Sequence, residues 1–410
     1  MKNNIPAIRF PEFTLGWKST TLNKVTNIIG GGTPDTKEPT YWDGEIDWYS
    51  PSEIGKKIYA DGSVRKITQL GLEKSSAKIL PANKTILFTS RAGIGDTAIL
   101  KKDGATNQGF QSLVVHDNCD VYFLYSMNNK IKSYALKNAS GSTFLEISGK
   151  NLGVMPMLIP SPEEQTKIGT FFKSLDDTIY LHQQELEALK QTKQGFLQKM
   201  FPKDGENVPQ IRFNEFSEPW TQIEFGKVIK LVGGATPLKE NKEYWNGDIV
   251  WLSSQEIKNK YVSKGTYLIT EQAVKDNRTK VVSEGTPLIV TRSGILAKRF
   301  PISISLNEVA INQDIKALIF DRERFDTEFI VAEIKSKELY ILNNIVKTGT
   351  TVQSVNLPDL NRMNLHIPEY AEQLKIGKFF RELDEVIDLK EKELEALKET
   401  KKGFLQKMFV

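Results

Sequence analysis

With 410 residues the chain exceeds what one hydrophobic core accommodates, so we expect at least two domains. A composition of 39% hydrophobic and 26% charged residues is typical of a globular protein and excludes fibrous and disordered classes, while a net charge of +4 permits nucleic acid as a partner without requiring it. One cysteine and three histidines exclude a disulfide framework and a Cys/His zinc site, and no stretch is apolar enough for a signal peptide or a membrane span, so we expect a cytoplasmic protein with no membrane contact.

The sequence contains one pattern twice. IRFPEF at Ile8–Phe13 returns as IRFNEF at Ile211–Phe216, and a Gly-Gly-x-Thr-Pro…Tyr-Trp…Gly-x-Ile-x-Trp series that ends at Trp48 returns at Trp251. The helical segment 163–201 returns at 371–409 with 26 of 39 residues identical, whereas the stretches between these frames diverge. Repeated frames favour a shared geometry or partner, and divergent middles favour one task performed on two different targets.

The globular segments alternate short β-branched or aromatic runs with turn residues, which predicts mixed α+β domains. We expect strands at Lys84–Phe88, Ala98–Leu100, Thr286–Val290 and Ile302–Ile304. Helices are expected at Val121–Lys137 and Phe325–Val346.

The repeated segments after Ser161 and Glu369 predict two long helices. Ser161, Pro162 and Glu164 form a helix start with a capping box, and apolar residues then recur at spacings of four and three, as in a coiled coil. The seam positions are Ile168, Phe172, Leu175, Ile179, Leu186, Leu189 and Phe196 in the first helix, and Ile376, Phe380, Leu383, Ile387, Leu394, Leu397 and Phe404 in the second.

Two interpretations of these stripes are open. Each helix could cover the core of its own domain, but near-identical stripes favour pairing with each other, and the chain order makes that pair antiparallel. The stretch from Ile168 to Met200 is about 50 Å long, the reach of about 15 base pairs at 3.4 Å each. Polar seam members (His182, Lys193, Lys390 and Lys401) are interpreted as register devices or edge positions of the seam and not as catalytic groups.

These patterns predict an α+β fold of two pseudo-symmetric mixed α/β domains joined by two long antiparallel helices that form a coiled-coil spacer. The expected boundaries are 1–160 for the first domain with its N-terminal arm, 161–203 for the first spacer helix, 204–368 for the second domain with its arm, and 369–410 for the second helix.

Candidate nucleic-acid contacts lie on turns of the globular segments, where the positive charge excess also lies. Arg and Lys read guanine or hold phosphates, and Asn and Gln read adenine, although any single such residue is more often a solvated surface group. The candidates are Lys56, Lys57, Arg65, Arg91, Asn107 and Gln108 in the first half, and Lys258, Lys260, Arg278, Arg292, Asn312 and Gln313 in the second.

Catalytic alternatives are weaker. The loop Gly30–Pro34 lacks the ending of a phosphate-binding P-loop, and no such motif or amino-methyltransferase tetrapeptide occurs elsewhere. Asp248, Glu256 and Lys258 imitate a nuclease arrangement, but the first half has Gly55 where the second has Lys258. A stand-alone nuclease and a purely protein-binding scaffold remain as alternatives.

The whole chain resembles the DNA-specificity subunit of type I restriction-modification systems. The resemblance rests on the full-length duplication, the GGTP…YW…G-I-W openings, the Gly141-Ser142-Thr143 and Gly349-Thr350-Thr351 turns, and the EQ-x-KIG…ELEALK…GFLQKMF helices. It implies two target-recognition domains, each reading half of a split double-stranded DNA site, and helices that act as a ruler. The length of the helix agrees independently, because its reach fits two half-sites roughly one helical turn apart with an unread spacer between them. It further implies a non-catalytic chain without cofactor or metal that recruits two methyltransferase subunits and two restriction/translocase subunits, on which S-adenosylmethionine, ATP and Mg²⁺ are expected.

Overall fold

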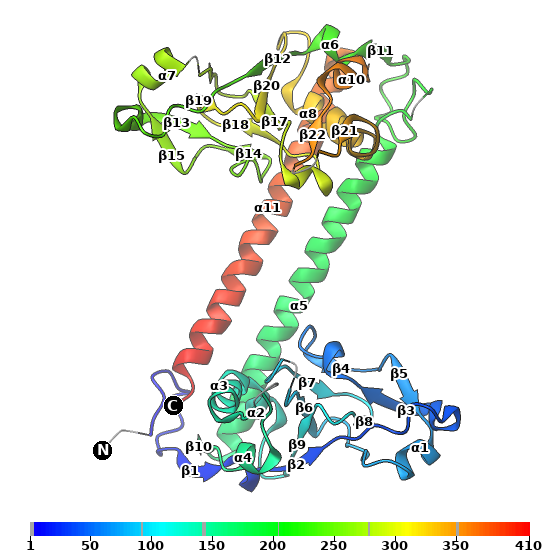
Figure 1. The fold of residues 1–410 in the computed structure, drawn as a ribbon, viewed down its shortest axis with the longest axis vertical. Helices are drawn as coiled ribbons and strands as arrows, with labels where there is room; N and C mark the ends of the chain where they lie inside the picture. The colour runs from blue at the N-terminus through cyan, green and yellow to red at the C-terminus, as the bar shows by residue number, and fades with distance from the viewer. Residues whose placement is uncertain (1–3, 92, 142–144, 204, 278, 350–351) are drawn as a thin grey trace. The chain divides into compact units, whose positions relative to one another are not determined.

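The computed structural model describes residues 4–410 except 92, 142–144, 204, 278 and 350–351. The chain forms two compact units, the first from residues 1–183 and 393–410 and the second from residues 184–392. Each unit holds one globular domain together with a section of each of two long helices, α5 (Pro162–Lys199) and α11 (Tyr370–Lys407) (Figure 1). Among the described residues, no helix is long and apolar enough to span a membrane.

The globular domain of the first unit is built on a five-stranded mixed sheet of order β2-β9-β6-β7-β4, a three-stranded sheet of order β5-β3-β8, and the pair β1-β10. Its strands are β1 (Lys18–Thr21), β2 (Thr26–Gly30), β3 (Trp42–Tyr49), β4 (Tyr59–Ala60), β5 (Arg65–Ile67), β6 (Thr85–Phe88), β7 (Thr97–Leu100), β8 (Gly104–Thr106), β9 (Gln111–Val115) and β10 (Pro156–Ile159). Its helices are α1 (Gln69–Glu73), α2 (Val121–Ser126), α3 (Asn128–Asn138) and α4 (Gly149–Gly153), with short 3₁₀ turns η1 (Leu22–Lys24), η2 (Pro39–Tyr41) and η3 (Pro51–Glu53).

Both faces of the five-stranded sheet are covered. Successive side chains of a strand point to opposite faces, and those of β6 enter two different clusters. Ile86 and Phe88 of β6 pack with residues of α2, α3 and α5, whereas Leu87 packs with Tyr49 of β3. This explains why its central strands are continuous apolar runs and not alternating ones.

The second unit repeats this topology, with sheets of order β12-β20-β17-β18-β14 and β15-β13-β19-β16 and the pairs β11-β23 and β21-β22. Its strands are β11 (Thr221–Glu224), β12 (Lys230–Gly233), β13 (Trp245–Leu252), β14 (Tyr261–Val262), β15 (Tyr267–Ile269), β16 (Val281–Val282), β17 (Pro287–Val290), β18 (Ile302–Ser305), β19 (Val309–Ile311), β20 (Ile315–Ile319), β21 (Val346–Lys347), β22 (Ser354–Val355) and β23 (Asn364–Ile367). Its helices are α6 (Phe225–Val228), α7 (Glu271–Asn277), α8 (Thr327–Ser336), α9 (Glu338–Tyr340) and α10 (Leu357–Arg362), with the 3₁₀ turns η4 (Lys242–Tyr244) and η5 (Gly294–Ala297) and the π-helical turn η6 (Ile341–Ile345).

The two long helices are in contact within each unit and run in opposite directions there. In the first unit Phe171 of α5 packs edge-on against Phe404 of α11, with ring centroids 5.0 Å apart. In the second unit Phe196 of α5 packs in the same way against Phe379 of α11, also at 5.0 Å. The expected α+β class and antiparallel helix pair are therefore confirmed.

The core of each unit is completed by an aromatic residue two positions after the end of the long helix that arrives from the other half of the chain. Phe409 packs against Trp17, Phe123 and Phe172 in the first unit. Phe201 packs against the equivalent aromatic rings of Trp220, Phe329 and Phe380 in the second. This shared packing explains why the sequence GFLQKMF is repeated.

The four expected strands are confirmed as β6, β7, β17 and β18. The continuous helix expected at Val121–Lys137 is wrong, because the chain divides at Met127 into α2 and α3. The helix expected at Phe325–Val346 is also divided, since α8 ends at Ser336 and is followed by α9 and a π-helical turn. Apolar periodicity continues through these breaks, which is why the sequence pattern did not reveal them.

Candidate nucleic-acid interface

Several loops gather at one edge of the five-stranded sheet in the first unit. Strands β2 and β6 end at this edge, and β9, β7 and β4 begin there, because β2 and β6 are antiparallel to β9 and β7 whereas β4 is parallel to β7. The loops at this edge are 31–34, 53–58, 89–91 with 93–96, and 107–110, which together we name the first loop edge. Loops held by a rigid scaffold are the usual place for binding residues.

Hydrogen bonds between backbones tie the loops of the first loop edge together. Gly32 N donates to Thr106 O at 2.8 Å, and Ser90 N donates to Gly109 O at 2.8 Å. Ile147 N also donates to Ser90 O at 3.1 Å, which brings the segment after the Gly141 turn to the same place. Residues far apart in the sequence therefore form one surface.

The second unit has an equivalent second loop edge, made of loops 234–237, 256–260, 291–301 and 312–314. Thr291 N donates to Asp314 O at 2.8 Å, and the Arg299 guanidinium donates to Lys258 O at 3.2 Å. Ser293 N donates to Gln353 O at 3.1 Å, so the segment after the Gly349 turn also joins this edge. Ser142, Thr143, Thr350 and Thr351 of the two turns lie outside the described residues.

The repeated Gly-Gly-x-Thr-Pro loop shapes these edges. A Cβ atom on Gly31 would lie 2.0 Å from Asn107 O, and one on Gly234 would lie 1.7 Å from Ile311 O, so only glycine permits this approach of two backbones. Thr33 then donates to the Gln108 side chain, and Thr236 donates to that of Gln313 at 2.7 Å. The loop orients the neighbouring Asn-Gln turn, which accounts for the repetition of both motifs.

Ten of the predicted contact residues lie in the loops of the two edges. Six of them are exposed: Lys56, Lys57 and Gln108 of the first edge and Lys258, Arg292 and Gln313 of the second. Arg91, Asn107 and Lys260 are partly exposed, and Asn312 is buried. Arg278 lies outside the described residues.

The two predicted asparagines belong to the same turns but face the backbone. Asn107 accepts a hydrogen bond from Gly109 N at 2.8 Å, and Asn312 accepts one from Asp314 N at 3.0 Å. Asn312 is also 95% buried. Both side chains therefore set the shape of the turn that presents the adjacent glutamine.

Two other predicted basic residues are occupied by contacts within the protein. The Arg65 guanidinium lies 3.6 Å from the ring centroid of Trp42, and Tyr267 packs edge-on against Trp245 at the matching place of the second unit, with centroids 5.7 Å apart. Lys260 forms ion pairs with Glu328 at 2.7 Å and Asp384 at 2.8 Å. Sequence spacing could not reveal these partners, because each is distant along the chain.

Glu256, one of the two carboxylates of the nuclease-like arrangement, has a structural role. Glu256 accepts hydrogen bonds from Ser253 N at 2.9 Å, Ser253 Oγ at 2.7 Å and Thr266 Oγ1 at 2.7 Å. Burial opposes ionisation of this side chain, but the hydrogen bonds outweigh it and lower its pKa. Glu53 caps the equivalent turn of the first unit through Ser50. Among the described residues, no group of three or more His, Cys, Asp or Glu side chains is placed to hold a metal ion.

The predicted seam positions are buried or partly buried in both helices. Three lysines of the seam form ion pairs across the helix pair: Lys401 with Asp176 at 2.5 Å, Lys193 with Asp384, and Lys390 with Glu185 at 3.2 Å. Nδ1 of the fourth polar member, His182, lies 3.7 Å from the Glu393 carboxylate. The buried Asp176 was not singled out in the sequence. Its equivalence to Asp384 in the repeat was the available signal.

The repeated arm and helix start are explained by one bidentate ion pair in each unit. Arg9 donates from Nε and Nη2 to Glu164 at 2.7 Å each, and Arg212 donates to Glu372 at 2.8 Å each. The capping box expected at Ser161 is therefore only half formed: Glu164 N donates to Ser161 Oγ at 3.4 Å, but the carboxylate binds the arm. Bidentate hydrogen bonds between a guanidinium and a carboxylate are stronger than hydrogen bonds between neutral groups.

Comparison with known proteins assigns the family. The model of the type I restriction modification DNA specificity domain matches residues 14–191 and 217–399. The chain is 28% identical to the type I restriction enzyme MjaIX specificity subunit of Methanocaldococcus jannaschii, over 96% of this chain and 92% of the relative. It is 32% identical to the EcoR124I/EcoR124II specificity subunit of Escherichia coli, over 42% of this chain and 43% of that protein.

The fold also matches solved structures. The type I restriction-modification S subunit from M. genitalium superposes with a TM-score of 0.65 at 16% identity, over 99% of both chains. A second structure, whose title describes complex assembly and conformational transition of the type I R-M system, superposes with a TM-score of 0.58 over 97% of this chain and 98% of that one. The chain belongs to the type I restriction-modification DNA specificity family and is a DNA sequence-specificity subunit, the non-catalytic component of such a system.

Proposed function

We propose that each globular domain reads one half of a split double-stranded DNA site through its loop edge. The recognition domains would be residues 1–160 and 204–368, and the spacer helices residues 161–203 and 369–410. The observation that carries this proposal is the gathering of exposed Lys, Arg and Gln side chains on equivalent loops of two units whose loop sequences differ. One scaffold with two different sets of base-reading groups suits two different half-sites.

The proposed contacts fall into two kinds. Arg91 and Gln108 in the first unit, and Arg292 and Gln313 in the second, carry the planar side chains that read base edges in pairs of hydrogen bonds. Lys56, Lys57 and Lys258 suit phosphate contacts, which position the protein without reading sequence. Arg278 is proposed as a DNA contact on the basis of the sequence alone. Asn107, Asn312, Arg65 and Lys260 act through the shape of the domain.

The long helices are proposed to set the spacing of the half-sites and to recruit partner subunits. Each has 38 residues and is continuous, so each extends about 57 Å. They carry apolar side chains in water: Leu181 of α5 is 65% exposed and Leu389 of α11 is 59% exposed, at equivalent positions of the repeat. Exposed apolar side chains at the same position of both helices favour a protein partner.

The proposed partners are two methyltransferase subunits and two restriction/translocase subunits. S-adenosylmethionine, ATP and Mg²⁺ would be bound by those subunits. The names of the relatives, which place them in type I restriction enzymes, support this assignment.

Nuclease footprinting of the chain with its methyltransferase subunits tests the split site. We expect two protected blocks of base contacts separated by a stretch whose sequence can be changed without loss of binding. A single uninterrupted block in which every base pair matters would contradict the proposal.

A further inference from the structure

We propose that Asp176 and Asp384 are positioning residues that fasten each globular domain to the helix pair and thereby fix the separation at which the two half-sites are read. Lys260 is the member that makes this fastening possible in the second unit. The inference rests on the proposed function of the helices as a spacer. It assigns that spacing to named side chains of the domains and not only to helix length.

The two aspartates occupy equivalent places in the repeat and in the structure. Each follows a seam leucine, Leu175 or Leu383, and each is deeply placed, with side-chain exposures of 5% and 14%. Each is paired with a lysine of the other long helix, Asp176 with Lys401 and Asp384 with Lys193. The helix–helix part of the arrangement is therefore the same in both units.

The contacts to the globular domain differ between the units. In the first, the Tyr122 hydroxyl of α2 donates to Asp176 Oδ2 at 2.8 Å. In the second, the matching residue is Glu328, since Tyr122 and Glu328 each stand two residues after the aspartate that caps α2 or α8. A carboxylate has thus replaced a hydroxyl donor directly beside Asp384.

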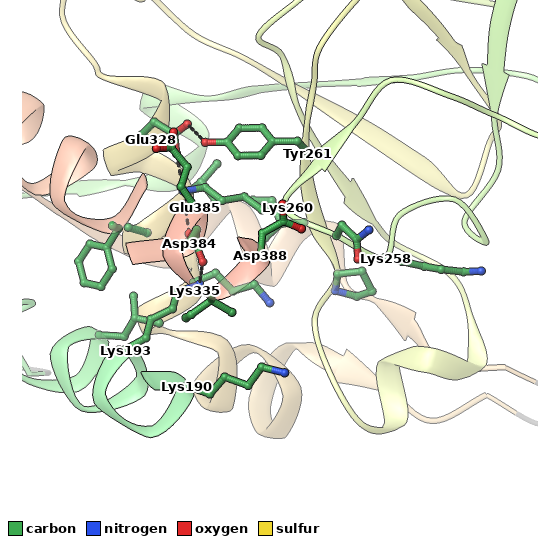
Figure 2. Close-up of a pocket in the computed structure, with 18 of the residues that line it drawn as sticks. Lys190, Lys193, Lys258, Lys260, Tyr261, Glu328, Lys335, Asp384, Glu385 and Asp388 are labelled. Carbon is green, nitrogen blue, oxygen red and sulfur yellow. Dashed lines mark hydrogen bonds and ion pairs between the residues drawn. The ribbon is translucent and has the colours of Figure 1, made fainter. Parts of the chain in front are cut away.

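Lys260 forms an ion pair with each of these two carboxylates and offsets their repulsion. Its Nζ lies 2.7 Å from Glu328 and 2.8 Å from Asp384, and all three side chains are about 15% exposed (Figure 2). The Tyr261 hydroxyl donates to the other oxygen of Glu328 at 2.6 Å. Two carboxylates that share one lysine in a poorly solvated place repel each other, and their proximity is unfavourable unless that cation lies between them.

The first unit lacks this lysine because it lacks the second carboxylate. Tyr59 of β4 and Tyr261 of β14 begin equivalent strands, so Ile58 is the counterpart of Lys260. Ile58 packs against the apolar core of its unit. The pair Ile58 and Tyr122 in one unit therefore corresponds to the pair Lys260 and Glu328 in the other, and the two pairs carry the same net charge.

The phenol groups remain donors at neutral pH. Burial raises the pKa of Tyr122, and the neighbouring Asp176 raises it further. Burial also raises the pKa of Tyr261, with a further contribution from its hydrogen bond to Glu328. Both hydroxyl groups therefore keep their protons at neutral pH, which suits a permanent positioning role.

The test compares three variants of the chain, each assembled with its methyltransferase subunits and given a plasmid library of split sites with varied spacer lengths. We expect Lys260→Ile to leave both half-sites unchanged and to raise modification of sites with a spacer one base pair shorter or longer, on the order of tenfold. The double variant Lys260→Ile/Glu328→Tyr, which copies the first unit, should restore the spacer selectivity of the wild type. Lys392→Ile, which removes an exposed lysine paired with Asp388 on the same helix, should change nothing.

Two results would overturn the proposal: a folded Lys260→Ile variant with the spacer selectivity of the wild type, or a double variant no closer to the wild type than the single one. If Lys260→Ile alone does not fold, the double variant decides, since a folded double variant with wild-type spacing supports the proposal and an unfolded one refutes it. Failure of the underlying function is distinguishable, because the wild type itself would then modify sites without regard to spacer length.

Discussion

Single atoms decide how the globular domains contact the long helices. A Cβ atom on Gly169 would lie 2.1 Å from Asp120 Oδ1, and one on Gly377 would lie 2.1 Å from Asp326 Oδ1. These aspartates cap α2 and α8 by accepting hydrogen bonds from Phe123 N and Phe329 N. The repeated Lys-Ile-Gly of the helices is thus a docking requirement.

We expect Gly377→Ala to lower the free energy of unfolding by about 1–3 kcal/mol, because the added methyl group displaces the capping aspartate. Gly403→Ala is the matched control, since it lies in the same helix with no atom within 4 Å of its added Cβ. That variant should gain up to about 1 kcal/mol from helix propensity alone. Urea unfolding of both variants measures the difference, and equal effects would contradict the docking argument.

The capping aspartates also predict a pH dependence. Burial raises the pKa of Asp326 above its ordinary value of 3.8, and Glu328 contributes further. A carboxyl group with a raised pKa stabilises the fold below its unfolded pKa, and that contribution is lost as pH rises through the folded pKa. Asp326→Asn keeps the cap without this titration. Its melting temperature should therefore rise relative to the wild type between about pH 4 and pH 7; a relative fall would contradict the assignment.

Two arginines of the first unit should have opposite effects. Arg91→Ala is expected to relax the modified sequence at one base pair of one half-site, by about 1–3 kcal/mol of discrimination, with little change in stability. Arg65→Ala, which removes the guanidinium above Trp42, should lower stability and leave the sequence unchanged. Modified-site mapping and thermal melting of both variants check this. If Arg65→Ala changed the modified DNA sequence and Arg91→Ala did not, the prediction would be contradicted.

At the scale of elements, the long helices and central strands could be predicted because their periodicity is local. The heptad seam and the apolar runs of β6, β7, β17 and β18 are readable within a few residues. The division of the helix at Met127 could not be predicted, because the apolar pattern continues across it. Asp176 was missed for another reason: its partners, Tyr122 and Lys401, come from distant parts of the chain.

The candidate site was predictable in its residue types and only partly in their tasks. Gln108 and Gln313 are exposed as a base-reading group requires, but Asn107 and Asn312, one position earlier, hold the turns. Lys57 is exposed, whereas Lys260 is held by two carboxylates. Exposure and partners depend on the tertiary fold, which a single sequence does not contain.

The spacer role of the helices predicts the effect of their length. Seven residues, one heptad, inserted after Gln183 and after Lys392 would preserve the seam and lengthen each helix by about 10 Å, or about 3 base pairs of DNA. We expect modification of the same two half-sites at a longer spacer. Insertion into one helix alone should break the ion pairs across the seam and lower the melting temperature. An unchanged spacer with both insertions would contradict the ruler.

At the scale of the whole molecule, the duplication explains the length of the chain. A chain of 410 residues is one pattern written twice, and each unit is completed by a helix end from the other half, Phe409 in the first and Phe201 in the second. This exchange keeps the frame sequences alike, because both units need the same aromatic contacts. The loops of the two edges have no such shared partner, so their sequences are free to differ.

The central claim, that each unit specifies one half of the DNA site, is tested most directly by exchanging residues 14–160 for the corresponding domain of another family member. The hybrid chain, assembled with its methyltransferase subunits, would be used to map every modified site on a sequence library. We expect one half-site to change while the other half-site and the spacer remain. An unchanged site, or a site altered in both halves, would contradict the account.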